Sequence, residues 1–383
     1  MTHYDAIVLG VGGMGSAALY HLARRGLRAL GIERYNIPHE MGSSHGLTRI
    51  IRLAYYEHPS YVPLLRRAYE LWRQLENTVQ ERLLIITGSI DASPEDGEVF
   101  RGSKASCDIH HLPHEVLGYR ELNTRFPGYR LSRGMAAVYQ PDGGFLLSER
   151  CIVAHVMAAQ ELGAEVHGRE RVIGWEPKGD GVALLTDRER YSADRLVICS
   201  GAWGAKLVPE LAALAVPERQ VLAWFQPTRP ALFRVHAFPV FNMAVEEGRY
   251  YGFPVYGIPG FKVGRYHHLE QRVDPDQMDR DAHREDEAVL RGFTARYFPE
   301  ATGPTMSLKT CLFTNTPDEH FILDLHPELP QVCIAAGFSG HGFKFCSVVG
   351  EIMADLAQRG RSQHNLDLFR LQRFQETLRV PPA

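Results

Sequence analysis

The sequence has few cysteines, and none of them is placed to hold a metal or staple the chain. The six cysteines are scattered over 383 residues, and no two form a C-x-x-C pair. Zinc sites and disulfide frameworks both need cysteines at short, regular spacings. We therefore expect no metal site and no disulfide scaffold. Cys199 and Cys333 lie in strand-like runs and fit the role of small buried apolar residues.

The chain also lacks an excess of charge and a long apolar run. Lys and Arg number 42 and Asp and Glu 45, for a net charge of -3. A protein that binds a polyphosphate backbone normally carries a basic surface, so we expect no nucleic-acid partner. No apolar run is long enough to span a membrane, and the N-terminus enters the strand-like "YDAIVLG" without a basic leader. These absences predict a cytoplasmic protein that does not bind membranes.

A nucleotide-binding pattern is present at the N-terminus. The run "DAIVLG" is followed by "GVGGMG", the helical stretch "SAALYHLARRG" and a second strand, "LRALGIE". Gly10, Gly12 and Gly15 form G-x-G-x-x-G, which permits a tight turn, close approach to a diphosphate and close packing of helix on strand. The diphosphate would sit at the helix N-terminus. Glu33 ends the second strand, where an acid can bond ribose hydroxyls. This acid disfavours NADP but leaves NAD and FAD open.

Two later glycine-rich stretches favour FAD. "RLVICSGAWGAKL" and "VCIAAGFSGHGFKF" each run from an apolar strand into glycines. Ordinary strand-to-helix turns have the same composition, but Gly340, Gly342 and Lys344 concentrate free amides and a cation before a helix, which suits an anionic ligand. A cofactor with a large fused ring needs such approach from several segments.

The length and the alternation of sequence character predict two interleaved domains. Helix and buried-strand patterns alternate with stretches of short alternating strands, glycine and proline. We expect an α/β protein in which a Rossmann-like FAD-binding domain, formed by 1–82, 148–215 and 319–383, is interleaved with an antiparallel-sheet substrate domain, formed by 83–147 and 216–318.

The stretch "MGSSHGLTRIIRLAYYEHPSYVPL" brings three basic side chains close in sequence. His45, Arg49 and Arg52 are spaced i, i+4 and i+7, so they would share one face if the segment were helical. No acidic residue separates them, and their charges would repel unless an anion lay opposite. The spacing therefore predicts an anion site.

Several longer motifs identify a family. "SSHGLTRIIR", "YYGFP", "FKVGRYHH…VDPD", "CLFTNTPDEHFILDLHPE" and "AAGFSGHGFKF" resemble, in order and near spacing, the monomeric sarcosine oxidase family of flavoproteins, which includes the N-methyltryptophan oxidases. The resemblance covers essentially the whole chain and implies the fold of the glycine/D-amino-acid oxidase type. It implies an FAD-dependent amine oxidase that converts sarcosine or a related N-methyl amino acid to the amino acid, formaldehyde and hydrogen peroxide, with dioxygen as acceptor. We expect a monomer.

The resemblance also assigns roles to single residues. Arg52 and Lys344 match the pair that holds the substrate carboxylate. His45 and Arg49 match residues over one flavin face, and Lys262 matches the residue over the other face that activates oxygen. Other matched positions are Tyr251 in the aromatic wall of the substrate cavity, Cys311 as the thioether link to FAD, and Ser43, Thr48, Val172, Gly201, Trp203 and Phe343 in the cofactor site.

The sequence departs from the family pattern near the substrate. Ser44, Leu47 and Phe313 replace a histidine, an acid and a tyrosine. One extra residue follows Lys262, so the expected active-site histidine maps to Tyr266 or His267. We favour His267, because an imidazole can bond the substrate amine. Asn242 and Met243 fall where members vary with substrate size.

Two rival functions stay open at this point. One is an oxidase of a cyclic or primary amino acid such as pipecolate, proline or glycine on the same fold. The other is a flavin-binding subunit or dehydrogenase that passes electrons to a partner protein. Lys262 argues against the second, since a dehydrogenase has no need to activate oxygen.

Overall fold

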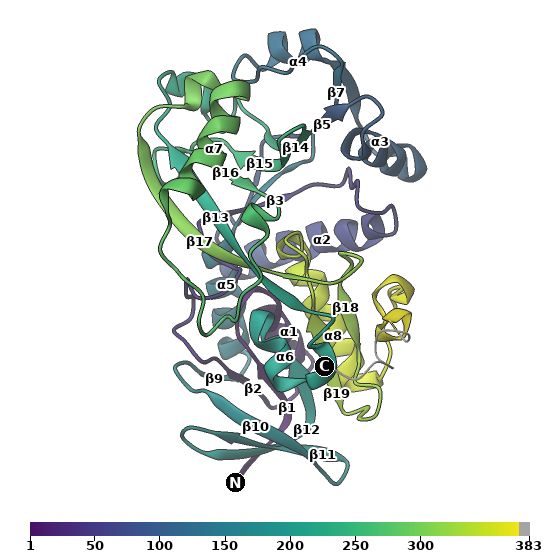
Figure 1. Ribbon diagram of the computed structural model, residues 1–383. Coiled ribbons are helices and arrows are strands. Elements are labelled where there is room, and N and C mark those ends of the chain that lie inside the picture. Colours follow the sequence, from purple (N-terminus) through teal and green to yellow (C-terminus); the bar gives the residue numbers. More distant parts are fainter. Residues whose placement is uncertain (375–383) are drawn as a thin grey trace.

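The computed structural model describes residues 1–374, so the end of the proposed segment 319–383 lies outside the described residues. Two large sheets dominate the molecule, one at each end of Figure 1, and the chain crosses between them repeatedly. A small third sheet lies where the two parts meet.

The first sheet is built around parallel strands from distant parts of the chain. β1 (Thr2–Leu9) lies between β2 (Ala29–Ile32) and β12 (Arg190–Ile198), and β2 also pairs with β9 (Glu165–His167). The far side of β12 pairs with β11 (Gly181–Thr186) and then with β19 (Val332–Ala336). β10 (Val172–Lys178) and β18 (Ile322–Leu325) extend the sheet. The inner strands are almost wholly apolar, as strands covered on both faces require.

Helices bring distant segments of the chain together against this sheet. α1 (Gly13–Arg24) packs against α5 (Ser148–Glu161) and α8 (Cys346–Arg359), and α8 also contacts α2 (Tyr61–Val79). Gly350 makes the α1–α8 contact possible, because a Cβ there would lie 2.5 Å from the Ala17 carbonyl carbon. These helices and strands form one large apolar core.

The second sheet is antiparallel except for one parallel pair, between β14 and β5. Its strands, in spatial order, are β17 (Thr305–Asn315), β13 (Val216–Phe225), β16 (Phe261–Arg265), β15 (Gly248–Phe253), β14 (Val240–Val245), β5 (Ser89–Pro94), β7 (Met135–Gln140) and β6 (Glu115–Gly118). α7 (Arg284–Tyr297) packs on this sheet, and its Phe293 ring stacks on Tyr250 with centroids 3.8 Å apart. α3 (Glu98–His110) and α4 (Tyr119–Arg125) lie at its other end (Figure 1). The sequence predicted only strands here, so these three helices are an addition.

The segment that carries His45, Arg49 and Arg52 is not helical, so the condition for the three side chains to share one face is not met. The chain turns at Gly46 and Leu47, whose φ values are +90° and +73°, and then forms strand β3 (Thr48–Ile51). β3 pairs with β8 (Gly144–Leu147), which pairs with β4 (Leu84–Ile86), in the third sheet. Positive φ interrupts a helix, and the β-branched Ile50 and Ile51 favour a strand.

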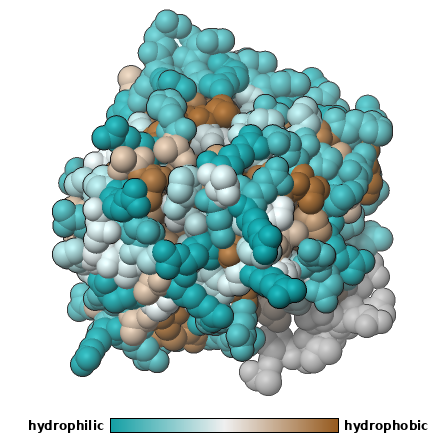
Figure 2. Space-filling view, turned by 90° about the horizontal axis from the view of Figure 1, so that it is seen from above, coloured by the Kyte–Doolittle hydropathy of each residue, from teal (hydrophilic) through white to brown (hydrophobic). Residues whose placement is uncertain are grey.

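The strands of the first sheet fall within 1–82, 148–215 and 319–374, and those of the second within 83–147 and 216–318. The third sheet joins a strand of the first set of segments to two from the second. Seen from above, the surface is mostly hydrophilic with scattered apolar side chains (Figure 2). Within residues 1–374, no helix is both long and apolar enough to cross a membrane.

Candidate active site

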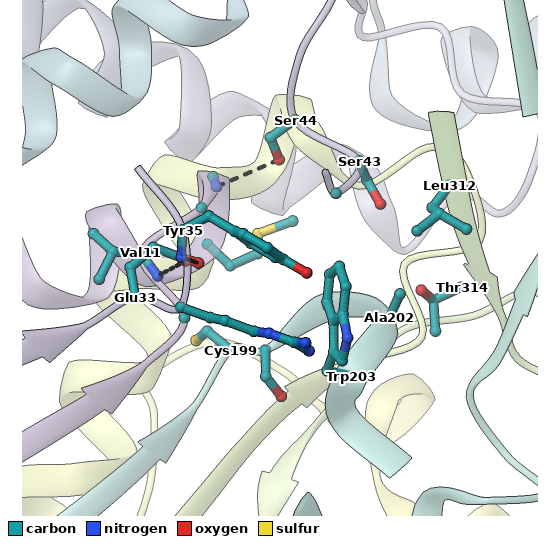
Figure 3. A pocket seen from close by; sticks show the side chains of 18 of the residues that line it. Val11, Glu33, Tyr35, Ser43, Ser44, Cys199, Ala202, Trp203, Leu312 and Thr314 are labelled. Atoms are coloured by element: carbon teal, nitrogen blue, oxygen red, sulfur yellow. Dashed lines mark hydrogen bonds between the residues drawn. The ribbon is translucent and has the colours of Figure 1, made fainter. Parts of the chain in front are cut away.

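A cavity of about 460 Å³ opens at the carboxyl ends of β1, β2 and β12. Its walls come from the glycine turn before α1, the turn after β12, the loop 38–44 and the turn before α8 (Figure 3). In parallel sheets this is where the turns meet and where ligands bind. The cavity therefore lies where the sequence predicted a dinucleotide.

The three glycines of the first turn have three different surroundings. Gly10 has φ +85°, and a Cβ there would lie 2.7 Å from the Cys199 carbonyl oxygen. A Cβ on Gly15 would lie 1.7 Å from the Gly10 carbonyl oxygen, so this glycine serves the packing of α1 on β1. A Cβ on Gly12 would meet only the Ser44 hydroxyl, at 4.0 Å. The open space is thus at Gly12, where a diphosphate needs to approach the backbone.

Glu33 is fixed at the end of β2 beside this turn. Its carboxylate accepts from the amides of Val11 at 2.9 Å and Tyr35 at 3.0 Å (Figure 3). Burial would raise the pKa of Glu33, but the bond from His39 and the two amides hold it below its ordinary value. The Glu33 side chain is therefore a buried, ionised hydrogen-bond acceptor, as a side chain that binds ribose hydroxyls must be.

Most of the predicted cofactor residues line this cavity. They are Gly10, Gly12, Glu33, Ser43, Val172, Gly201, Trp203, Gly340, Gly342 and Phe343. Gly201 has φ +54° and nothing within 4 Å of a Cβ position, so it leaves space for a ligand as Gly12 does. Gly15, Thr48, Cys311 and Lys344 are outside the lining. The shape and the donor set fit FAD.

Arg49 lines the cavity and links it to Cys311 and His45, which lie behind the lining. The Arg49 guanidinium donates to the Ser43 carbonyl at 2.7 Å and lies 3.6 Å from the Cys311 sulfur. Cys311 is 3% exposed, and its sulfur is 3.8 Å from the Ser43 carbonyl oxygen. Burial and then Arg49 lower the pKa of His45 to about 3. Neither ring nitrogen of His45 has a hydrogen-bond partner within residues 1–374, which fits a missing ligand.

Lys262 enters from β16 and is fully enclosed. Its Nζ donates to the carbonyls of Gly46 and Thr48, both at 2.7 Å, and to the Thr48 hydroxyl at 3.0 Å. It also lies 4.3 Å from the Phe253 ring centroid. Burial, followed by the charge of Arg49, lowers the pKa of Lys262 well below its ordinary value.

Arg52 does not share a face with Arg49, and its charge is met within the chain. Its Nη2 donates to both carboxylate oxygens of Glu57, at 3.1 and 3.0 Å, and its Nε lies 3.5 Å from Asp91. The sequence argument for an unbalanced cation at Arg52 is therefore wrong, because it considered only the acids between the basic residues. Burial would raise the pKa of Glu57, but Arg52 and its neighbours hold it at about 2, whereas burial raises the pKa of Asp91 to about 6.

Lys344 is the other predicted carboxylate ligand and is more weakly held. Its Nζ donates to the His341 carbonyl at 2.6 Å and lies 5.3 Å from the Tyr55 ring centroid. The Arg52 guanidinium also lies over the Tyr55 ring, with its Cζ 4.5 Å from the ring centroid. Burial, and then the charge of Arg52, lowers the pKa of Lys344 to about 7. Lys344 and Arg52 thus meet around one tyrosine ring.

The preference for His267 over Tyr266 is reversed by the geometry. His267 Nδ1 lies 3.2 Å from Glu218, and Nε2 lies 2.9 Å from Glu319. These two acids raise the pKa of His267 to about 9. The ring of Tyr266 instead packs on Tyr251, with centroids 5.2 Å apart. His267 has a φ of +51°, which turns it out of the strand that carries Lys262.

The residues expected to vary with substrate size point elsewhere. Met243 is fully buried in the core of the second sheet. Asn242 donates to Asp91 at 3.0 Å and so supports the carboxylate behind Arg52.

A loop that follows β16 lines part of the cavity. Asp276 of the "VDPD" motif accepts from Trp203 Nε1 at 2.8 Å and from Arg34 and Lys206, both at 2.5 Å. Trp203 and Tyr35 lie at the same end of the cavity, with ring centroids 5.6 Å apart (Figure 3). The sequence singled out this motif without giving it a role.

Sequence reasoning missed Glu57, Asp91, Asp276 and Arg249. Glu57 was within reach, since it lies five residues after Arg52 in the same quoted stretch. Asp91 and Asp276 come from distant segments, and no local pattern links them to their partners. Arg249 directly precedes the "YYGFP" motif and gave no signal of its own.

Comparisons with known proteins agree with this site. Residues 5–356 match the family model described as FAD dependent oxidoreductase. The chain is 42% identical to the monomeric sarcosine oxidase of Bacillus sp. (strain NS-129), over 97% of each chain. It is 34% identical to the N-methyl-L-tryptophan oxidase of Yersinia pestis (strain Pestoides F), over 97% of this chain and 99% of that one. The fold matches NikD, an unusual amino acid oxidase essential for nikkomycin biosynthesis, with TM-score 0.85, 26% identity and coverage of 97% and 98%. The chain therefore belongs to the FAD-dependent oxidoreductase family, in the group of the monomeric sarcosine and N-methyltryptophan oxidases.

Proposed function

We propose that this enzyme oxidatively demethylates an N-methyl amino acid of the sarcosine type, with FAD attached through Cys311 and dioxygen as acceptor. The observation that supports the proposal is that Arg49, which lines the cofactor cavity, lies 3.6 Å from the Cys311 sulfur, while neither ring nitrogen of the buried His45 has a partner among the described residues. When bound, FAD would supply the two-electron oxidation of the C–N bond and return the electrons to dioxygen as hydrogen peroxide.

The chain's own residues divide the remaining work. Arg52 and Lys344 bind the substrate carboxylate, and their meeting on the Tyr55 ring supports a shared anion. Glu57 holds the Arg52 guanidinium by a two-point contact and so orients it. Tyr251 and Tyr266 form the wall beside the amine, and this assignment replaces that of His267.

Lys262 and Arg49 supply charge in different places, while His45, with its pKa lowered to about 3, is a neutral imidazole. Lys262 is preorganised by three hydrogen bonds, so it can stabilise negative charge that develops on dioxygen without reorganisation. Arg49 offers a positive charge at the end of the cavity where Cys311 lies. The proposed FAD-binding segments are 1–82, 148–215 and 319–383, and the proposed substrate segments are 83–147 and 216–318.

The test is a substrate panel scored for two products. Purified enzyme is given sarcosine, N-methyl-L-tryptophan, pipecolate, L-proline and glycine, and peroxide and formaldehyde are measured together. Equal amounts of peroxide and formaldehyde from an N-methyl amino acid are expected. Peroxide without formaldehyde from pipecolate or proline would favour the cyclic-amine alternative. Reduction of an artificial acceptor without peroxide would contradict the oxidase assignment.

A further inference from the structure

Arg249 lies on the same face of the second sheet as the proposed catalytic groups. Tyr251 pairs with Gly264, and the Tyr266 amide donates to the Arg249 carbonyl at 2.8 Å. Because side chains alternate along a strand, Arg249 and Tyr251 of β15 share a face with Lys262 and Tyr266. The opposite face, with Tyr250, belongs to the core. Arg249 therefore faces the proposed substrate cavity.

The guanidinium of Arg249 is held by aromatic rings near Arg52. Its Cζ lies 4.1 Å from the Tyr266 ring centroid and 5.6 Å from that of Tyr56. The same Tyr56 ring contacts the Arg52 guanidinium, at 4.6 Å. Two guanidinium groups are thus placed on one tyrosine ring. On the neighbouring strand β14, the residue opposite Arg249 is Ala244, whose side chain is too small to cover the guanidinium.

The hydrogen-bonding capacity of Arg249 is largely unused. Within residues 1–374, its one carboxylate contact is a 3.4 Å approach to Glu319, which is also shared with His267 at 2.9 Å. A guanidinium has five N–H donors, so most of those on Arg249 remain free. Its side chain is 21% exposed, while the neighbouring Tyr56 is 4% exposed and its hydroxyl has no partner among the described residues. These groups together form a site for an acceptor.

We propose that Arg249 binds a second acidic group, carried by the side chain of the substrate, while Arg52 and Lys344 hold its α-carboxylate. The substrate class is then the acidic N-methyl amino acids, such as N-methyl-L-aspartate and N-methyl-L-glutamate. A planar guanidinium can bind such a carboxylate through two parallel N–H donors. This inference rests on the proposed function for the identity of the substrate, but not for the existence of the subsite.

A binding experiment tests the subsite without turnover. Two non-oxidisable ligands, glutarate and butyrate, which is glutarate without its second carboxylate, are titrated into the holoenzyme and followed by the change in flavin absorption. Wild-type enzyme is expected to bind glutarate roughly ten- to hundredfold more tightly than butyrate, the range of a charge-assisted hydrogen bond. Arg249→Met, which keeps an unbranched chain on the two rings, should bring this ratio close to one.

Matched variants separate the subsite from a structural role. Arg265→Met removes an arginine of β16 that faces the other way, 6.0 Å from the Tyr250 ring, and should keep the wild-type ratio. Arg249→Lys keeps a charge and should retain part of the preference. The inference is overturned if wild-type enzyme does not prefer glutarate, or if Arg249→Met weakens both ligands by the same factor.

Turnover of acidic substrates completes the test. The ratio of kcat/KM for N-methyl-L-glutamate to that for N-methyl-L-norvaline, its uncharged counterpart, should fall in Arg249→Met mainly through KM. If no N-methyl amino acid is oxidised but the glutarate preference depends on Arg249, the proposed function fails and the subsite stands. If N-methyl amino acids are oxidised and wild-type enzyme shows no glutarate preference, the subsite fails alone.

Discussion

At the scale of single residues, two buried cysteines near the cofactor cavity have different surroundings. Cys311 lies beside Arg49 and the carbonyls of Gly42 and Ser43. Cys199 directly follows β12, and a Cβ added to Gly15 would lie 3.3 Å from the Cys199 Cβ. Of these two cysteines, only Cys311 is at the position that matches the covalent link to FAD in the family.

The flavin is expected to stay with the protein after acid precipitation, and Cys311→Ser should release it. The reason is that a thioether survives unfolding, whereas the contacts of the cavity do not. The measurement is flavin absorbance in pellet and supernatant. Cys199→Ser is the matched control and should keep its flavin in the pellet. Release of flavin from the wild-type precipitate would refute the link.

Lys344 should make ligand binding depend on pH. Its pKa is lowered to about 7, mainly by burial, so its charge is present below pH 7 and is lost as pH rises through that value. A carboxylate prefers the charged form, and the affinity for acetate should fall by up to about tenfold per pH unit above pH 7. Titrations of flavin absorption between pH 6.5 and 8.5 measure this. In Lys344→Met the affinity should be low and almost flat, and a wild-type slope in that variant would place the titrating group elsewhere.

Lys262→Met should slow flavin reoxidation while anaerobic flavin reduction by substrate stays near the wild-type rate. Removing a preorganised charge of this kind costs roughly two to three powers of ten in rate. Anaerobic stopped-flow, followed by mixing with oxygenated buffer, separates the two half-reactions. Lys309→Met, which removes a partly exposed lysine paired with Glu40, is the control. Reoxidation at the wild-type rate would remove Lys262 from oxygen activation.

At the scale of elements, the contact between β15 and β16 depends on one glycine. The Tyr251 ring lies over Gly264, and a Cβ there would be 2.5 Å from its Cζ. Gly264→Ala must therefore displace the tyrosine, at a cost of about 1–3 kcal/mol for overpacking. We expect a raised KM with unchanged flavin content, measured by steady-state kinetics. Gly292→Ala in α7, where a Cβ would meet nothing within 4 Å, is the control. Wild-type KM in Gly264→Ala would show that Tyr251 does not position the substrate.

The elements that the sequence predicted well are those with strong local signals. The strand, glycine turn and helix at the N-terminus, the amphipathic α2 and the helix after "FSGHGFKF" all form as expected. The structure of the segment around Arg49 stayed open, because spacing alone cannot distinguish a helix from a turn followed by a strand. The turn with positive φ values at Gly46 and Leu47 is held by Glu149, which lies far along the chain. The Glu149 carboxylate accepts hydrogen bonds from the amides of both residues.

The site was predicted as far as its motifs reached. The glycines, Glu33 and Cys311 were proposed because each has a fixed local context. The carboxylates beside Arg52 and the loop carrying Asp276 are brought in by tertiary packing, which no local pattern encodes. The position of Tyr266 required the backbone itself, because one inserted residue left two registers possible.

At the scale of the whole molecule, buried histidines should make stability sensitive to acid. His155 is 1% exposed among Trp72 and Tyr20, and burial lowers its pKa to about 3. The unfolded chain therefore binds a proton below pH 6.5 that the folded chain does not, and stability falls from pH 6.5 towards pH 3. The slope is about 1.4 kcal/mol per pH unit for each such group.

The variant His155→Phe should reduce this acid sensitivity. Urea unfolding at pH 7.5 and at pH 5 measures it, and the loss of stability between the two should be smaller than in wild type. His236→Phe changes an exposed histidine and should behave as wild type. An unchanged difference in His155→Phe would assign the acid sensitivity to other groups.

The interleaving of segments in the first sheet also determines when the sheet can be completed during translation. β12 pairs with β1 from the start of the chain and with β19 near its end, and the turn with Gly340 and Gly342 follows β19. At about 5–20 residues per second, roughly 15–60 seconds separate the emergence of β2 from that of β19. Until then the nascent sheet has an unpaired strand and an incomplete cavity. The cofactor cavity is therefore complete only after β19 and the turn that follows it have emerged from the ribosome.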